Sequence, residues 1–153
     1  MVDKEIIQSH LANNLPPQTV LGFDFGMKRI GVAVGQTLTA TANPLMTLPA
    51  RDGIPDWQQI AELICTWRPQ LLVVGIPLNM DGTIQPITYA AKRFAKKLQA
   101  RYHLPVDEMD ERLTTVTARN EVYEQGGYRA LQKKPIDSVA AQLILVHWLS
   151  EHC

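Results

Sequence analysis

The feature that most limits the possible folds is a pair of short apolar segments, the first of which contains a single carboxylate. Residues 20–25 read VLGFDF and residues 30–34 read IGVAV, and both patterns are typical of β-strands. Asp24 therefore lies in a segment that the pattern predicts to be buried. Because burying an unpaired charge is costly, we expect a metal ion, a hydrogen-bond donor or a Lys or Arg side chain beside Asp24.

The two segments begin a run of three strands connected by short links. Residues 26–29 suit a tight hairpin between the first two strands. A third strand is predicted over residues 39–48, where Pro44 is compatible only with a sheet edge or a β-bulge. The first part of the chain should therefore form three antiparallel strands.

The rest of the chain alternates between helices and strands. Apolar residues between 57 and 67 recur at the spacing of one buried helix face, with Pro55 expected in the first turn and the end at Arg68. Residues 71–75 form the continuous apolar run of a parallel strand that is covered on both faces. Further elements are expected as a helix from Pro86, a strand over 105–110, a helix over 114–125 and a last helix over 136–152.

This order predicts an α/β fold with a five-stranded mixed sheet, three antiparallel N-terminal strands followed by parallel strands, flanked by helices. A Rossmann-type fold is not expected, because a hairpin follows the first strand where that fold has a helix. The polar residues 1–19, which end near Pro16 and Pro17, are interpreted as a flexible N-terminal arm. Residues 20–153 are interpreted as a single domain, since this length suffices for one sizeable core.

Composition limits the function classes. The 15 basic and 15 acidic residues cancel, so any nucleic-acid surface must be local. We expect a cytoplasmic protein without a membrane partner, because no apolar run approaches the ~20 residues of a membrane span. Cys65 and Cys153 form no CxxC pattern and the four histidines show no zinc-ligand spacing, so reduced cysteines and no zinc are expected.

Three acidic residues fall where such a sheet would bring them together. Asp24 lies in the first strand, Glu111 ends the last strand and Asp137 begins the last helix. Crowded carboxylates repel one another unless hard divalent ions hold them, which indicates Mg²⁺ or Mn²⁺. Strand alternation favours Glu111 over Asp110 as the neighbour of Asp24. Taken singly, Asp137 also fits a residue favoured by the helix dipole, and Glu111 a solvated strand end.

The YqgF proteins, also called RuvX, resemble this chain in four ordered blocks over about residues 20 to 150. These blocks are GFDFGMKRIGVAVG, VVGIPLNMDGT, DERLTTVTAR, and EQGGYRAL followed by an Asp in the terminal helix. A lone DxG would be a weak signal, because actin-like ATPases have a similar strand opening. The resemblance places the chain in the RNase H-like superfamily, which includes Holliday-junction resolvases.

The resemblance implies an RNase H-like nuclease domain over residues 20–153, with Asp24, Glu111 and Asp137 as catalytic residues and metal ligands. Two ions, Mg²⁺ or Mn²⁺, would activate a water and stabilise the leaving oxygen. Resolvases of this superfamily carry a fourth carboxylate three residues after the helix Asp, where this chain has Ala140. Asp81 or Asp110 is an alternative ligand, although Asp81 followed by glycine favours a turn.

Basic residues near these blocks are candidates for phosphate binding, because backbone phosphates require cations. The segment GGYRALQKKP adds flexible glycines and one aromatic ring, which suits a grip on a nucleic-acid strand. By contrast, the basic residues of the helix after Pro86, Lys92, Arg93, Lys96 and Lys97, are interpreted as a solvated face. The predicted nucleic-acid-binding residues are Lys28, Arg29, Arg112, Arg119, Arg129, Lys133 and Lys134.

The leading interpretation is a metal-dependent endonuclease acting on structured nucleic acid, with maturation of the 5′ end of pre-16S rRNA favoured by the resemblance. Holliday-junction resolution uses the same chemistry on branched DNA, and it would require a two-fold homodimer for paired cuts. A non-catalytic nucleic-acid-binding factor in transcription or ribosome assembly is the alternative from another class, supported by the missing fourth carboxylate. An ATPase fragment is disfavoured, because actin-like ATPases need two such domains.

Overall fold

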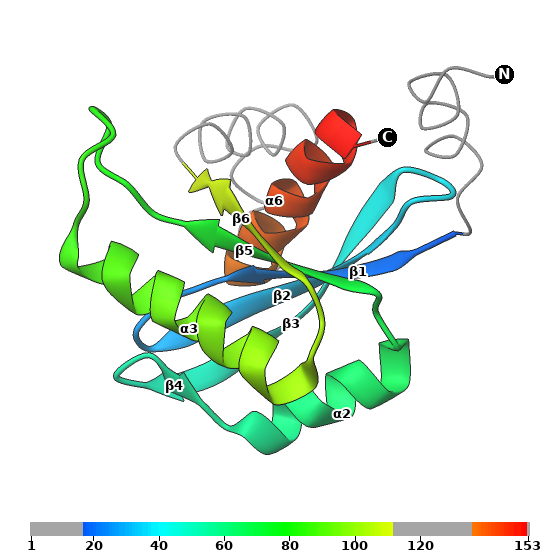
Figure 1. The fold of residues 1–153 in the computed structure, drawn as a ribbon, viewed down its shortest axis with the longest axis horizontal. Coiled ribbons are helices and arrows are strands. Elements are labelled where there is room, and N and C mark those ends of the chain that lie inside the picture. Colours follow the sequence, from blue (N-terminus) through cyan, green and yellow to red (C-terminus); the bar gives the residue numbers. More distant parts are fainter. Residues whose placement is uncertain (1–16, 112–135, 153) are drawn as a thin grey trace, which may run out of the picture.

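The computed structural model describes residues 17–111 and 136–152, and its centre is a six-stranded sheet in the order β4-β3-β2-β1-β5-β6 (Figure 1). Strands β1 to β4 pair antiparallel in succession, whereas β5 pairs parallel to β1 and β6 pairs parallel to β5. The strands are β1 (Thr19–Asp24), β2 (Arg29–Gln36), β3 (Thr41–Arg51), β4 (Ile54–Pro55), β5 (Leu71–Ile76) and β6 (Val106–Asp110).

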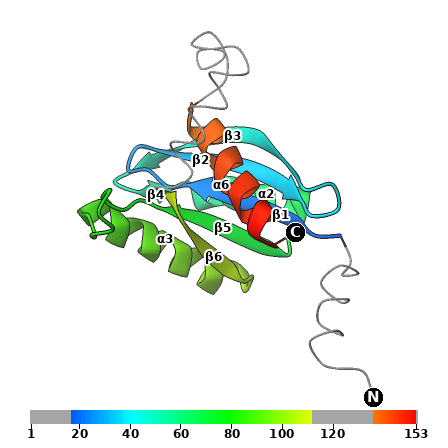
Figure 2. The ribbon, with the colours of Figure 1, turned by 90° about the horizontal axis from the view of Figure 1, so that it is seen from above.

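Helices cover both faces of this sheet. Helices α2 (Trp57–Trp67) and α3 (Pro86–Tyr102) lie against one face, and α6 (Ile136–His152) crosses the other (Figures 1 and 2). None of the helices in the described ranges is long and apolar enough to span a membrane. The helix expected over 114–125 and the arm expected over residues 1–16 lie outside the described residues.

Strand alternation divides the core into two clusters, one on each face of the sheet. In β1, Leu21 and Phe23 point toward α2 and α3, and Phe25 continues this side just past the strand. Val20 points the other way and packs with Leu145 of α6. Because side chains alternate along a strand, Asp24 belongs to the α6 face and Phe25 to the α2 and α3 face.

The mixed sheet agrees with the predicted fold class, the expected bulge is present at Pro44, and the prediction for Pro55 differs from the structure. At Pro44 the pairing of β2 with β3 shifts register between Val32 and Ala33, which is the bulge that proline requires. The prediction that Pro55 lies in the first turn of a helix is wrong. Pro55 instead pairs with Ala50 in the additional two-residue strand β4.

Helix α2 begins at Trp57, two residues after Pro55, because Asp56 is its N-cap. The Asp56 carboxylate accepts a hydrogen bond from the Gln58 backbone N–H at 3.0 Å, which satisfies a donor that the first turn leaves open. The helix ends where predicted, since Arg68 adopts a left-handed conformation and its N–H donates to the Ile64 carbonyl. Cys65, on this helix, is an exposed free thiol.

Candidate functional site

Asp24 ends the central strand β1, and the residue beside it on each neighbouring strand is a glycine. Gly31 of β2 pairs with Asp24 on one side and Gly75 of β5 pairs with it on the other. The carboxylate therefore stands between two positions that lack side chains. On the α6 face, other parts of the chain can therefore approach the sheet closely on both sides of Asp24.

Other parts of the chain fill the space above the two glycines. A Cβ built on Gly75 would lie 2.5 Å from the Glu111 carboxylate oxygen Oε1, so the Glu111 side chain lies directly over Gly75. A Cβ built on Gly31 would overlap the backbone carbonyl of Asp137, at the start of α6. The glycines thus allow Glu111 and the first turn of α6 to approach Asp24 from opposite sides.

Strand alternation in β6 selects Glu111 over Asp110, as the sequence predicted. Met109 packs in the cluster on the α6 face, and Asp107 accepts a hydrogen bond from the indole nitrogen of Trp148 on α6 at 2.9 Å. Glu108, one residue out of phase, forms an ion pair on the α3 side. Residues two apart in a strand share a face, so Asp110 points to the α3 side with Glu108, and Glu111 points to the α6 side with Met109 and Asp24.

Asp24 and Glu111 share a hydrogen bond between their carboxyl groups, and the pKa of each is raised. Burial raises the pKa of Asp24 most, the charge of Asp137 raises it further, and the hydrogen bond from Glu111 partly opposes this. Burial is also the largest influence on Glu111, and with the Asp24 hydrogen bond and the charges of Asp24 and Asp110 it raises the pKa of Glu111 to about 10. At neutral pH the pair therefore holds a proton.

Asp137 reaches this pair from the first turn of α6. Its carboxylate lies 3.6 Å from the Arg29 Nε atom, and the Arg29 side chain remains 71% exposed. Ala141, four residues further along α6, is fully buried, while Ala140 occupies the position of the missing fourth carboxylate. The small residues let α6 approach the sheet closely beside Asp137.

The donor chemistry of these three residues fits a hard divalent cation. All three offer carboxylate oxygens, which are the ligands that Mg²⁺ and Mn²⁺ prefer. Asp24 and Glu111 share a proton, and the Asp137 carboxylate is nearby. Within residues 17–111 and 136–152, no three His, Cys, Asp or Glu side chains are already arranged to hold one ion together. An ion that binds here would take the place of the shared proton, so binding should strengthen as pH rises.

The other predicted site residues are placed only in part. Lys28 is exposed in the turn between β1 and β2, and Arg29 is the exposed first residue of β2, beside the Asp137 carboxylate. Asp81 accepts hydrogen bonds from the Thr83 backbone N–H at 3.0 Å and from its hydroxyl at 2.6 Å, which supports the turn role predicted for it. The remaining predicted phosphate-binding residues, Arg112, Arg119, Arg129, Lys133 and Lys134, lie outside the described residues.

Sequence reasoning missed the two glycines that build the site. Gly31 and Gly75 each interrupt an apolar strand, and a glycine inside a strand often marks a close approach of other backbone. That signal was present in IGVAV and LLVVG. The sequence pattern does not give the register of β1 with β2 and with β5, and only this register shows that both glycines pair with Asp24.

The raised pKa of Glu111 makes stability depend on pH. The unfolded chain releases this proton near pH 4.5, whereas the folded chain keeps it to about pH 10. Because the unfolded state then binds fewer protons, the free energy of unfolding should fall as pH rises through this window, by at most about 1.4 kcal/mol per pH unit. In chelator, Glu111→Gln should flatten this decline in urea titrations between pH 6 and 8.

The control for this measurement is Glu62→Gln, which removes an exposed carboxylate on α2. We expect this variant to follow the wild-type pH dependence. Equal slopes for the wild type and Glu111→Gln would contradict a proton held at Glu111 in the folded chain.

Known proteins of similar sequence are nucleases by name. The family model for RuvX, described as a Holliday junction resolvase, matches residues 18–151. A protein of Glaesserella parasuis named "Putative pre-16S rRNA nuclease" is 54% identical over 134 residues, covering 88% of this chain and 97% of that protein. A Coxiella burnetii (strain Dugway 5J108-111) protein of the same name is 59% identical over 133 residues, covering 86% and 92% respectively.

Solved structures with a similar fold are resolvases. RuvC of T. thermophilus in complex with a Holliday junction substrate has a TM-score of 0.56 and 17% identity, covering 88% of this chain and 94% of that chain. The fowlpox virus resolvase with its junction DNA has a TM-score of 0.53 and 11% identity, covering 87% and 97%. At these identities the likeness concerns the fold, and it confirms the predicted RNase H-like class.

Proposed function

This chain belongs to the RuvX family, and from that membership we propose that it is a metal-dependent endonuclease that processes the 5′ end of pre-16S rRNA, with Asp24, Glu111 and Asp137 as its reacting centre. The family and the names of its relatives make the chain a nuclease. The substrate is carried over from those relatives, which match most of both chains at more than half identity.

The observation that carries the assignment of the centre is the hydrogen-bonded pair of Asp24 and Glu111, with Asp137 beside it. Burial raises the pKa of Asp24 and of Glu111, and carboxylates perturbed in this way occur most often at functional sites. Here they meet at the end of a strand, where two glycines make room for Glu111 and for the start of α6. A purely structural role gives no reason for this burial.

The three carboxylates would hold Mg²⁺ or Mn²⁺, which supplies an activated water and stabilises the charge on the leaving oxygen during phosphodiester hydrolysis. Asp24 is fixed by the central strand and serves as the rigid ligand. Glu111 follows the end of β6 and Asp137 lies in the first turn of α6, so the three ligands come from three separate elements. Two ions remain our proposal, although Ala140 offers no fourth carboxylate.

Arg29 and Lys28 would bind phosphates next to this centre. Arg29 lies beside Asp137 with most of its side chain exposed, so its guanidinium can contact a phosphate that approaches the carboxylates. Lys28 directly precedes it, in the turn that leads into β2. The five predicted basic residues between 112 and 134 would extend this contact along the substrate, and the site of action would be the cytoplasm.

Junction resolution is the second candidate, because the family model carries that description. It would use the same carboxylates on branched DNA. Paired cuts in opposite strands would require a two-fold homodimer that presents two centres. Sedimentation of the protein with a four-way junction distinguishes the two readings, since only resolution predicts two copies per junction.

The decisive experiment incubates the purified protein with end-labelled pre-16S rRNA or with a four-way DNA junction, in Mg²⁺, Mn²⁺ or chelator. We expect the rRNA precursor to be cut near its mature 5′ end with either ion and to remain intact in chelator. Cleavage of the junction alone would favour resolution. Binding without cleavage of either substrate would support the non-catalytic factor.

Asp137→Asn provides the matched variant, because it keeps the shape of the side chain but removes a charged ligand. We expect cleavage to fall at least a hundredfold with this variant, on the scale of a lost metal ligand or its partner. Asp56→Asn is the control, since asparagine preserves the N-cap of α2 and this residue lies away from the centre. Equal cleavage by wild type and Asp137→Asn would remove Asp137 from the mechanism.

A further inference from the structure

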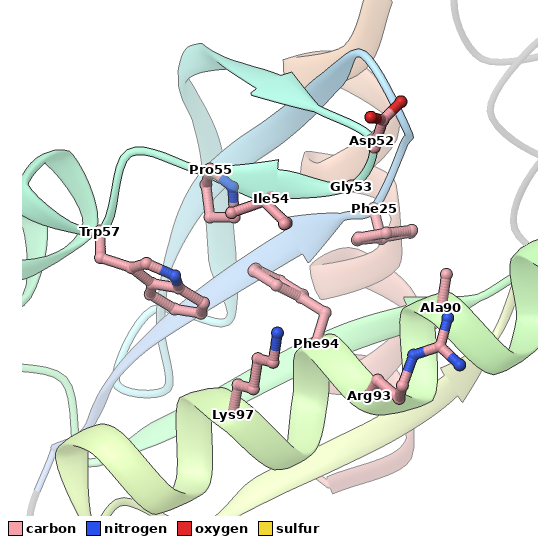
Figure 3. Close-up of a pocket in the computed structure, with 10 residues that line it drawn as sticks. All are labelled: Phe25, Asp52, Gly53, Ile54, Pro55, Trp57, Ala90, Arg93, Phe94 and Lys97. Atoms are coloured by element: carbon pink, nitrogen blue, oxygen red, sulfur yellow. The ribbon is translucent and has the colours of Figure 1, made fainter.

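We propose that a pocket on the opposite face of the sheet binds one unstacked nucleotide of the substrate, an inference that rests on the proposed nuclease function. The pocket has a volume of about 170 Å³ and lies between the β3–β4 turn, the start of α2 and the first half of α3 (Figure 3). This is well below the roughly 300–1,000 Å³ of most small-molecule sites, so it suits one ring system rather than a whole cofactor.

The walls of the pocket combine aromatic rings with polar and charged groups. Phe25, Trp57 and Phe94 supply the aromatic surface, and Ile54 of β4 adds a side chain from a residue that is 54% exposed (Figure 3). Trp57 is fixed on two sides, because Phe94 stacks at 5.9 Å between ring centroids and the Arg101 guanidinium lies 4.2 Å from its ring centre. A preformed wall lowers the entropic cost of binding a base.

Two cations belong to the same pocket. Arg93 and Lys97 lie one turn apart on α3 and extend along the side of the pocket that α3 forms (Figure 3). Neither forms an ion pair with any residue in the described ranges, whereas Lys92 on the next stripe of α3 pairs with Glu108 at 3.6 Å. Asp52 lies at the opposite rim, so a bound phosphate would belong at the α3 side.

One residue that lines the pocket is adjacent in sequence to a residue of the carboxylate centre. Phe25, which lines the pocket, follows Asp24 directly, and consecutive side chains of a strand point to opposite faces. The β1–β2 turn connects the two faces and is held against the β3–β4 turn, where the Gly53 N–H donates to the Met27 carbonyl at 2.8 Å. A nucleic-acid strand that passes from the carboxylates over this turn would reach the pocket on its Phe25 side.

This inference changes the interpretation of the basic helix face. The sequence assigned Arg93 and Lys97 to a solvated surface together with Lys92 and Lys96. In the structure Arg93 and Lys97 line the pocket, while Lys92 and Lys96 do not. A polyanion with flat apolar rings matches both the charge and the walls, and single-stranded nucleic acid has this composition.

The test measures binding of a short single-stranded RNA that carries 2-aminopurine at successive positions, in chelator so that cleavage cannot occur. We expect one position to show the fluorescence rise of an unstacked base. Arg93→Gln with Lys97→Gln should weaken binding about tenfold and lower the slope of log K against log salt by up to about 1.4. Lys92→Gln with Lys96→Gln removes the same charge from α3 outside the pocket and should change affinity much less.

Ala90→Leu distinguishes binding inside the pocket from electrostatic attraction to the surface of α3. Ala90 lines the pocket one turn before Phe94 and is only partly buried, so the larger side chain should occupy the cavity without disturbing the core. We expect weaker binding, loss of the fluorescence rise and an unchanged salt slope. Thermal unfolding of each variant verifies that the fold is intact.

Equal losses from both double variants, with no effect of Ala90→Leu, would overturn the pocket and leave only a charged surface. Competition by polyglutamate as effective as that by RNA of equal charge would also overturn it, since the occupant would then be an acidic peptide. Because binding is measured without metal, the pocket can fail while cleavage succeeds. Conversely, an RNA that binds in the pocket but is never cut would contradict only the nuclease centre.

Discussion

Replacing Asp24 with asparagine should lower cleavage by about a thousandfold or more, or roughly 4 kcal/mol of transition-state stabilisation, and yet should stabilise the metal-free protein. Asp24 is the carboxylate that the proposed centre depends on most, because it lies at the end of the central strand between two glycines. Asparagine keeps the shape of the side chain but is a much weaker ligand for a hard cation. Single-turnover cleavage of the proposed rRNA substrate measures the loss.

The gain in stability follows from the raised pKa of Asp24. Burial and the charge of Asp137 disfavour its ionised form, and the hydrogen bond from Glu111 opposes them only in part, so the ionised carboxylate carries a net electrostatic cost when no cation is bound. A neutral amide removes that cost. In chelator at pH 8 the melting temperature of Asp24→Asn should exceed that of the wild type, and added Mn²⁺ should raise the wild-type value more than the variant value.

Asp81→Asn is the control for this variant. Asparagine can preserve the turn in which Asp81 accepts hydrogen bonds from Thr83, and we expect full cleavage. A large loss with Asp81→Asn would revive the alternative in which Asp81 supplies a metal ligand. Cleavage by Asp24→Asn at the wild-type rate, in Mg²⁺ and in Mn²⁺, would remove Asp24 from the reaction.

Replacing Gly31 with alanine should cost about 3 kcal/mol or more of stability and abolish cleavage. A Cβ at this position would overlap the carbonyl of Asp137 and lie 2.8 Å from the Ser138 nitrogen, and both are backbone atoms that no rotamer change can move. Overpacking commonly costs 1–3 kcal/mol even where flexible side chains can adjust, so about 3 kcal/mol is expected as a minimum here. The start of α6, which carries Asp137, must then shift away from the sheet.

Gly35→Ala is the matched control because it lies in the same strand and faces the same helix. A Cβ there would meet Leu145 at 3.4 Å and Leu149 at 3.6 Å, close to ordinary contact distances. We expect its unfolding midpoint in urea to remain within about 1 kcal/mol of the wild type. If Gly31→Ala were as stable and active as Gly35→Ala, the close approach of α6 to β2 would not be needed for the site.

Local patterns in the sequence were sufficient to predict most of the architecture. The apolar run before Gly75 predicted a strand buried on both faces, and the spacing from Trp57 to Trp67 predicted one helix face. Both depend on residues near one another in the chain. Pro55 was misassigned because its fixed φ suits either a first helical turn or a strand edge, and the pairing with Ala50 that decides between them comes from β3.

The site divides in the same way. Alternation along β6 predicted that only one of Asp110 and Glu111 could face Asp24, because it requires only the order of residues in one strand. The contacts of β6 with α6 and α3 show that this residue is Glu111. The hydrogen bond between Glu111 and Asp24, and the glycines that make room for it, depend on three strands at once. The pocket beside Arg93 was beyond the sequence for the same reason, since its lining comes from two helices and a turn.

Asp24 and Phe25 are consecutive residues, so their side chains point to opposite faces of the sheet. The number of residues that precede them in β1 determines which face each one occupies. Inserting or deleting one residue in the middle of β1 would exchange the two environments, sending the phenyl ring toward α6 and the carboxylate toward the aromatic cavity. Chains that keep this architecture should therefore tolerate changes of length at the hairpins and loops, and not within this strand. The number of residues in β1 therefore determines which face of the sheet carries the proposed carboxylate centre and which carries the proposed nucleotide pocket.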